Sequence, residues 1–198
     1  MISKNKIKTL RSLNTKKGRL LNKIILLEGK RLIEEVLSGE NKIRRIWATK
    51  EFENNNLKFT KKINFEEISN KEIKMITGTV HPQGIIAITE IEKSSLDAIS
   101  GNAILLDNIS DPGNLGTIMR SACWFGVRNI FLSEGCVDPY NSKVIRSAMG
   151  AHFKQNIVID KLENLINHLY LNNYQLLSTD LNSDNNLKSL KIDKNKKW

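Results

Sequence analysis

The chain has 198 residues, of which 40% are hydrophobic and 26% charged, and only 3 are proline. This composition is typical of a globular protein of one or two domains, and it excludes a collagen, a mucin and a wholly disordered chain. No apolar run approaches the roughly 18 residues of a membrane span, so we expect a protein without membrane segments.

Basic side chains are concentrated near the amino terminus. The formal net charge is +10, and eight basic residues but no acidic one precede Glu28. Such an arm attracts polyanions through counterion release, which favours a nucleic-acid partner. The richness in Lys, Asn and Ile offers a second explanation, because it also indicates a codon bias towards A and T. A transit peptide is disfavoured because those segments prefer Arg and Ser to Lys.

Residues 1–97 form the first predicted domain, in which helix and strand signals alternate. The expected order is helices over 4–14 and 15–22, a strand at Ile24–Glu28, a helix at Lys30–Leu37, a strand at Ile43–Thr49, a helix at Glu66–Thr77 and a strand at Gly84–Glu90. The run Asn54-Asn55-Asn56 predicts a turn or loop. The more polar stretch 91–101 predicts a domain boundary near residue 97.

Residues 98–198 form the second predicted domain, a repeating β-α unit. Helices at about 115–125, 141–149 and 162–172 separate four short apolar strands, Ala103–Leu106, Ile130–Ser133, Ile157–Ile159 and Leu176–Ser178. This alternation predicts an α/β fold with a parallel sheet covered by helices on both faces. Ligands usually bind at the carboxyl ends of such strands, which directs attention to 107–114.

The segment from Asp107 to Arg120 carries the residues of greatest chemical interest. Pro112 and Gly113 predict a turn, after which Asn114 is suited to cap the next helix. Arg120 lies six positions after Asn114, so the two side chains meet only if Asn114 stays outside the helix. Without further context, a capping Asn and a surface Arg explain this segment equally well.

The wider sequence around this segment resembles the SpoU/TrmH family of RNA ribose methyltransferases, members of the SPOUT or α/β-knot superfamily. The matching stretch is LLDNISDPGNLGTIMRSACWFGVRNIFL, which contains Asn114-x-Gly116-x-x-x-Arg120, and GCVDPYNSKVIRSAMGAHF follows it. Upstream, LEGKRLIEE and HPQGIIA resemble the family's small amino-terminal RNA-binding domain, which has a ribosomal-protein-like fold. Several motifs in the same order are more specific than a single motif.

The resemblance implies transfer of a methyl group from S-adenosylmethionine to a ribose 2′-hydroxyl of ribosomal or transfer RNA, in the cytoplasm. It implies that Arg120 activates or orients that hydroxyl and that Asn114 supports the geometry of the motif. Arginine keeps its proton, so binding a phosphate and orienting the nucleophile is the simpler role. No metal is needed for this chemistry. The cationic residues expected to contact RNA are Lys4, Lys6, Lys8, Arg11, Lys16, Lys17, Arg19, Lys30 and Arg31.

The family's second and third motifs are not found in these 198 residues. The tetrapeptide Leu132-Ser133-Glu134-Gly135 resembles the second motif, but it lies too close to Arg120 and lacks the leading glycine, so we interpret Glu134 as a loop residue. We therefore expect the cofactor-binding residues and the homodimer contact of the family to be absent, with the knot incomplete. An interrupted gene, a fragment and a degenerate homologue all explain this pattern.

Two functions of different classes follow. The first is a methyltransferase by descent, inactive on its own as this chain; the second is a non-catalytic RNA-binding protein. A dinucleotide-binding or Rossmann-type methyltransferase fails because no Gly-x-Gly-x-x-Gly loop follows the strand at Ala103–Leu106. Cys123 and Cys136 are too few for a disulfide framework and indicate reduced packing residues of a cytosolic protein.

Overall fold

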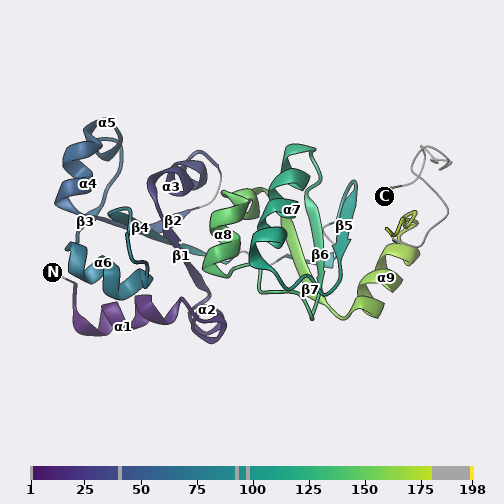
Figure 1. Ribbon diagram of the computed structural model, residues 1–198. Coiled ribbons are helices and arrows are strands. Elements are labelled where there is room, and N and C mark those ends of the chain that lie inside the picture. The colour runs from purple at the N-terminus through teal and green to yellow at the C-terminus, as the bar shows by residue number, and fades with distance from the viewer. Residues whose placement is uncertain (1, 40–41, 92–93, 97–98, 180–196) are drawn as a thin grey trace.

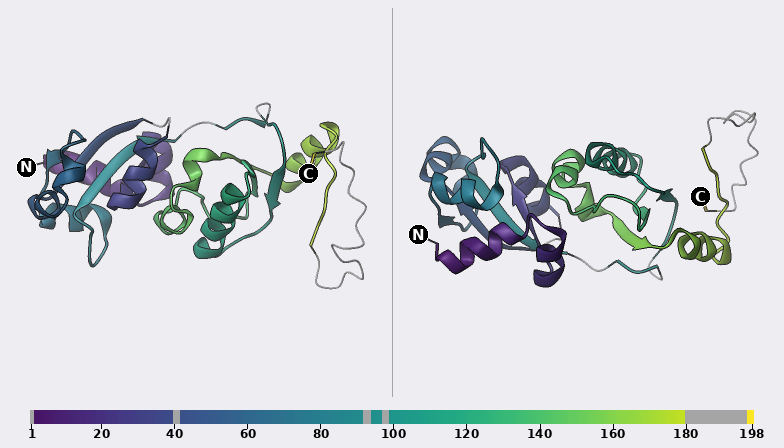
Figure 2. Two further views of the ribbon diagram at one scale, coloured as in Figure 1. Left: turned by 90° about the horizontal axis from the view of Figure 1, so that it is seen from above. Right: turned by 60° about the horizontal axis from the view of Figure 1, so that its bottom comes forward.

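The protein consists of two α/β units packed end to end (Figure 1). The computed structural model describes residues 2–39, 42–91, 94–96, 99–179 and 197–198. The predicted boundary near residue 97 falls on residues outside the described part of the chain. The amino terminus lies at the far end of the first unit, and α9 and the carboxyl terminus lie at the far end of the second (Figures 1 and 2).

The first unit is a four-stranded sheet with helices on both faces. Its elements are α1 (Lys4–Ser12), α2 (Lys16–Asn22), β1 (Ile24–Glu28), α3 (Lys30–Leu37), β2 (Ile43–Ala48), α4 (Lys50–Asn55), α5 (Leu57–Thr60), β3 (Glu66–Glu67), α6 (Asn70–Thr77) and β4 (Ile85–Glu90). The strand order is β1-β4-β2-β3, with β4 antiparallel to both neighbours and β3 parallel to β2.

Both faces of this sheet are buried, because successive strand residues point to opposite sides. Ile25 and Leu27 pack on one side with Ile33 of α3 and Phe52 of α4. On the other side the strands pack against Leu10 of α1, Leu13 just after it, and Ile73 and Ile76 of α6. The helices of the first unit are thus held by two separate apolar clusters.

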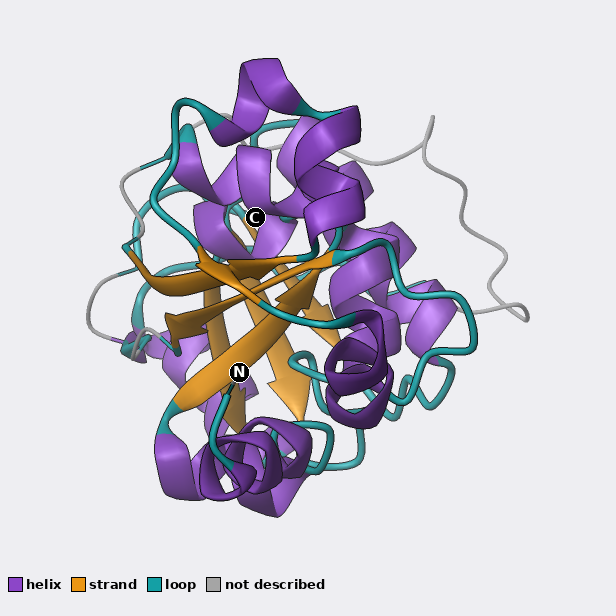
Figure 3. Ribbon diagram, turned by 90° about the vertical axis from the view of Figure 1, so that its left-hand side faces the viewer, coloured by secondary structure: helices purple, strands orange, loops and turns teal. Residues whose placement is uncertain are grey.

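The second unit is a parallel sheet between helices. Its elements are β5 (Ala103–Leu106), α7 (Pro112–Trp124), β6 (Asn129–Ser133), α8 (Ser142–Ala148), the 3-10 helix η2 (Ala151–Lys154), β7 (Asn156–Asp160) and α9 (Leu162–Leu171). Strands β5, β6 and β7 pair in chain order and in parallel. Helices α7 and α8 cover one face, and α9 covers the other by packing Leu165 and Leu169 on Phe131. This architecture confirms the predicted α/β class (Figure 3).

Three local predictions are wrong. The helix expected over Glu66–Thr77 begins only at Asn70, because Ser69 and Glu72 form a capping box, and Glu66–Glu67 pair with β2 instead. The turn or loop expected at 54–56 is limited to Asn56, because Asn54 and Asn55 are the last residues of α4. Leu176–Ser178 form no strand: the adjacent Tyr174 makes only an isolated bridge to Lys197, while its hydroxyl donates to the Gly101 carbonyl at 2.7 Å.

The two units meet where α8 packs on β1 and α3. Ile145 of α8 lies in the same apolar cluster as Ile25, Leu32 and Ile33 of the first unit. Gly150, with a φ of +92°, allows a close approach of the two units, because a Cβ there would lie 2.7 Å from Cγ of Glu35. Besides these contacts, the Glu35 carboxylate pairs with the Lys154 ammonium across the junction.

Candidate functional site

The loop that opens α7 differs from its prediction in which residue caps the helix. Asp111, not Asn114, is the capping residue: its Oδ1 accepts the backbone N–H of Asn114 at 2.7 Å. Pro112 then occupies the first helical position, where its missing N–H costs nothing. Asn114 therefore lies inside the helix, and the requirement for it to meet Arg120 is not satisfied.

The side chains of Arg120 and Asn114 lie on different faces of α7. Six residues of an α-helix turn the side-chain direction by about 240° beyond one full turn, so the two do not share a face. Arg120 is exposed and lines a groove of about 680 Å³ that Asn114 does not line. Of the two predicted catalytic residues, the structure brings only Arg120 into a cavity.

This groove, which we call the junction groove, lies between α3 of the first unit and the second half of α7. Its lining includes Arg31 and Glu35 from α3, Arg120, Trp124 and Phe125 from α7, and Arg128 and Lys154 beyond it. The predicted ligand segment 107–114 precedes and begins α7, at the carboxyl ends of the strands. The groove lies instead at the other end of that helix, where β6 begins.

The groove is strongly cationic. Arg31, Arg120, Arg128 and Lys154 are exposed and face a single carboxylate, Glu35, among the residues that line it. The hydrogen bond and charge of Glu35 raise the pKa of Lys154, so the Lys154 ammonium stays charged near neutral pH. An anionic polymer with a regular phosphate spacing fits such a surface.

The remaining cations predicted to bind RNA are mostly exposed on α1, α2 and α3. The exposed ones are Lys4, Lys8, Arg11, Lys16, Lys17 and Arg31. Lys6 is half-buried with its ammonium 5.8 Å from the centroid of the Trp47 ring, and Lys30 lies 5.5 Å from that of Phe59. These positions leave the cations accessible along one continuous stretch of chain.

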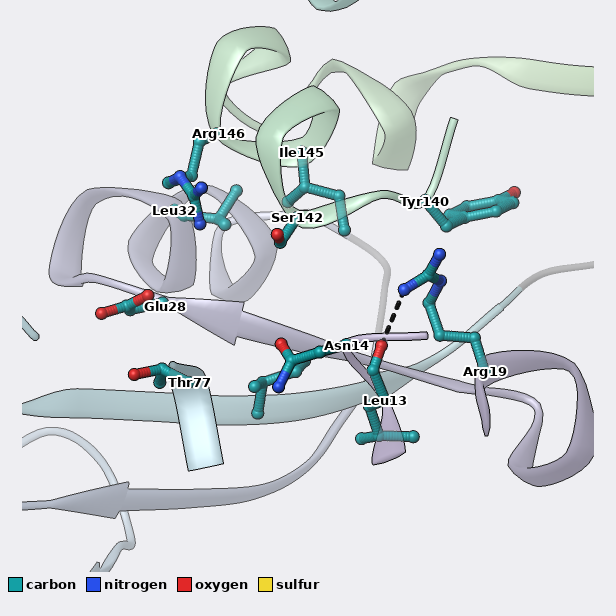
Figure 4. Close-up of a pocket in the computed structure, with 11 residues that line it drawn as sticks. Leu13, Asn14, Arg19, Glu28, Leu32, Thr77, Tyr140, Ser142, Ile145 and Arg146 are labelled. Carbon is teal, nitrogen blue, oxygen red and sulfur yellow. Dashed lines mark hydrogen bonds between the residues drawn. The ribbon is translucent and has the colours of Figure 1, made fainter. Parts of the chain in front are cut away.

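Arg19 is a correction to that set. Its guanidinium is 5% exposed, donates to the Leu13 carbonyl at 2.7 Å and pairs with the carboxylate of Asp138 in the second unit. Figure 4 shows the side chain directed towards Tyr140, at the junction, with its bond to Leu13 drawn. A buried, paired guanidinium does not contact phosphate, so Arg19 joins the two units instead.

The carboxyl ends of β5 and β6 are closed on each other. The Asn108 backbone N–H donates to Oγ of Ser133 at 3.0 Å, and the Cys136 thiol contacts the Leu106 carbonyl at 3.3 Å. Asn108 also fills the space beside Gly135, where a Cβ would lie 1.9 Å from its Oδ1. These contacts tie the ends of β5 and β6 to each other. Glu134 is an exposed turn residue, as expected.

Among the described residues, His152 is the titratable group whose pKa departs far from its ordinary value. Its ring is 6% exposed, and its Nε2 lies 2.6 Å from the Pro139 carbonyl, which fixes Nε2 as the protonated nitrogen. Burial lowers its pKa to about 4, despite the opposing effects of Pro139 and Asp138. The imidazole is therefore neutral and structural, and it lies beside the loop that holds Asp138.

Sequence analysis missed the aromatic part of the groove. Trp124 follows Arg120 by four residues, a spacing that aligns two side chains on one side of a helix. That signal was available for α7, but the pairing of this face with α3 of the other unit was not.

Two family models match the chain, one for each unit. Residues 101–198 match the SpoU rRNA Methylase family, and residues 4–87 match the MRM3-like substrate binding domain. Among the described residues, no helix is long and apolar enough to cross a membrane, and no cluster of His, Cys, Asp and Glu is placed to hold a metal.

Similar proteins carry matching names. The chain is 31% identical over 176 residues to the 23S rRNA (guanosine(2553)-2′-O)-methyltransferase RlmP of Bacillus subtilis, covering 89% of this chain and 70% of that protein. It is 37% identical over 149 residues to the human mitochondrial rRNA methyltransferase 3, but spans 34% of it. An AdoMet-bound rRNA methyltransferase from Sinorhizobium meliloti superposes with a TM-score of 0.81 at 27% identity, covering 96% of this chain and 75% of that one.

Proposed function

Because the chain belongs to the SpoU family of rRNA methylases, we propose that it serves the methylation of a ribose 2′-hydroxyl in ribosomal RNA. The observation that carries this proposal is the position of Arg120. It lies within the family region and lines a cationic groove to which both units contribute. A groove of this kind binds a phosphate backbone while one side chain positions the reacting sugar.

Arg120 is proposed as the residue that orients the nucleotide. Its planar fork of donors suits two oxygens of one phosphate, and it stays protonated throughout. Fixing the phosphate next to the reacting ribose limits the rotation of the 2′-hydroxyl, which is the main contribution of positioning to rate. Asn114 is proposed to support the motif from a distance, because its backbone amide ties the capping Asp111 to α7.

S-adenosylmethionine is the cofactor of the family, and it supplies the methyl group as a sulfonium. The described residues at the ends of β5 and β6 do not show a fit for it, because Asn108, Ser133 and Cys136 are bonded to one another and to the backbone. We therefore assign no residue of this chain to the cofactor and derive only the RNA-facing part of the reaction.

Binding of RNA is the first part to test. Titration of a fluorescent fragment of 23S rRNA with the full chain should give an affinity that falls steeply between about 50 and 200 mM salt, because Lys–phosphate and Arg–phosphate contacts release counterions. Neutralising Lys16 and Lys17, which are exposed on α2, should flatten that slope by about one for each contact removed. Binding that is insensitive to salt would contradict the proposal.

Methylation itself is tested in the organism. Disruption of the gene should remove one 2′-O-methyl mark from ribosomal RNA, mapped by protection of the modified ribose from alkaline cleavage. The intact gene should restore the mark, and Arg120→Ala and Arg120→Lys should not, since a point charge does not reproduce a bidentate contact. An unchanged methylation map would exclude the proposed activity.

A second function, RNA binding without catalysis, is favoured by one observation. Among the residues that the structure describes, Asn108, Ser133 and Gly135 at the ends of β5 and β6 are packed against one another, where a cofactor would otherwise find space. This function predicts that the protein cross-links to ribosomal RNA in cells while its disruption changes no 2′-O-methyl mark. The absence of the family's homodimer contact from this chain and the cytoplasmic location remain predictions.

A further inference from the structure

Two adjacent aromatic side chains lie almost fully in solvent at the end of α7. Trp124 is 87% exposed and Phe125 is 81% exposed. Large aromatic rings gain free energy when buried, so two neighbouring exposed rings on one rim indicate a surface that a ligand covers. Neither ring contributes to the apolar clusters that hold the second unit together.

These rings share the junction groove with its free cations. Trp124 follows Arg120 by four residues, so both lie on the same face of α7 one turn apart. Arg31 approaches from α3, and Arg128 follows the helix. The one facing carboxylate, Glu35, is already paired with Lys154, which leaves three guanidinium groups for phosphates.

We propose that Trp124, with Phe125 beside it, is a stacking platform for an unpaired base of RNA whose phosphates lie on Arg31, Arg120 and Arg128. The inference rests on the proposed function and adds the form of RNA to it. Stacking needs a base that is free of a helix, so the groove takes a loop, a bulge or a single strand. Such a base would lie next to the nucleotide that Arg120 orients.

Charge decides between RNA and a second copy of the chain as the occupant. A symmetric contact through the junction groove would bring two surfaces with an excess of cations together, and like charges at an interface are costly. RNA removes that conflict, because each phosphate neutralises a guanidinium while the bases offer π faces to the rings.

The chain provides a matched control on α9. Tyr170 is 76% exposed, similar to Trp124, but it is not among the residues that line the junction groove. Trp124→Ala and Tyr170→Ala therefore remove exposed rings of comparable accessibility, and neither is expected to disturb folding.

The experiment measures the affinity of the full chain for a single-stranded RNA of about 12 nucleotides by fluorescence anisotropy. We expect Trp124→Ala to weaken binding roughly 10-fold with an unchanged salt slope, since stacking is worth about 1–3 kcal/mol per base. Trp124→Phe should retain most of the affinity, and Tyr170→Ala all of it. Arg120→Ala should instead reduce the salt slope by about one.

A series of RNAs, each with one abasic nucleotide, identifies the stacked base. At one position the abasic RNA should bind the original chain and Trp124→Ala equally, because the ring has no partner there.

Equal affinity of the two proteins for intact RNA would overturn the stacking platform and leave the proposed function standing. Absence of any salt-dependent binding would overturn both. A dimer that Trp124→Ala converts to a monomer in sedimentation, with RNA affinity unchanged, would assign the surface to a second copy.

Discussion

At the scale of single residues, charge type does not reveal what a cation does. Arg19 and Lys16 lie three positions apart in the same basic arm, yet Arg19 is buried against Asp138 and Lys16 is exposed. The difference arises from a partner 119 positions away along the chain. The residues near Arg19 in the chain give no sign of so distant a partner, so the sequence alone could not distinguish the role of Arg19 from that of Lys16.

We predict that Arg19→Ala destabilises the protein by about 3 kcal/mol, because it leaves the Asp138 carboxylate, which is 13% exposed, without its partner. Urea unfolding followed by circular dichroism measures this. Arg44→Ala is the control: its pair with Glu90 is about half exposed, and its loss should cost less than about 1 kcal/mol. Equal costs for the two variants, or a change in RNA salt slope with Arg19→Ala, would contradict the internal role.

His152 gives a prediction about pH. The pKa of its buried ring is about 4 in the folded protein and about 6.5 when unfolded, so between these values protons bind only to the unfolded chain. This contribution to stability is complete above pH 6.5 and is lost as pH falls towards 4. Lowering the pH from 7 to 5 should cost about 2 kcal/mol.

His152→Gln tests this, because its amide is able to replace the bond to the Pro139 carbonyl without titrating. The free energy of unfolding of this variant should change less between pH 7 and 5 than that of the original chain. The comparison uses the slopes with pH, so a lower absolute stability of the variant does not affect it. Parallel curves would show that another group is responsible.

At the scale of elements, the sequence predicted those with a strong internal signal. Lys30–Leu37 was predicted with its observed bounds because apolar residues recur at helical spacing and Gly39 follows. The helix predicted over Glu66–Thr77 starts later, because the capping box formed by Ser69 and Glu72 fixes its first residue at Asn70. The strand predicted at Leu176–Ser178 does not form, because a short apolar run becomes a strand only if the fold places another strand beside it.

The packing of α7 on α8 depends on Gly116. A Cβ there would lie 2.5 Å from that of Ser147 and 2.8 Å from the Val144 carbonyl, so the helices would have to separate. We predict that Gly116→Ala costs about 2 kcal/mol despite its better helix propensity. Gly113→Ala is the same change on the same helix, where a new Cβ meets only Oδ1 of Asp111 at 3.1 Å, and it should stay within about 1 kcal/mol. A neutral Gly116→Ala in thermal unfolding would show that the helices move apart freely.

At the scale of the whole molecule, the groove exists only because the two units are docked. Arg31 comes from α3 and Arg120 from α7, and the contacts of Ile145, Gly150 and the Arg19–Asp138 pair fix their relative position. The family motif predicted Arg120 as a site residue, but not its surroundings. Those depend on how two independently predicted units pack, which neither hydrophobic period nor motif spacing encodes.

The last prediction concerns the cofactor. A polypeptide of residues 1–198 should show no saturable binding of S-adenosylmethionine at micromolar concentration in equilibrium dialysis. The physical reason is that described residues tie the ends of β5 and β6 to each other: the Asn108 backbone N–H donates to Oγ of Ser133, and Sγ of Cys136 contacts that Oγ and the Leu106 carbonyl. RNA titration of the same preparation is the control for correct folding, since the junction groove depends on both units. One-to-one binding of the labelled cofactor would show that this edge opens and would contradict the prediction.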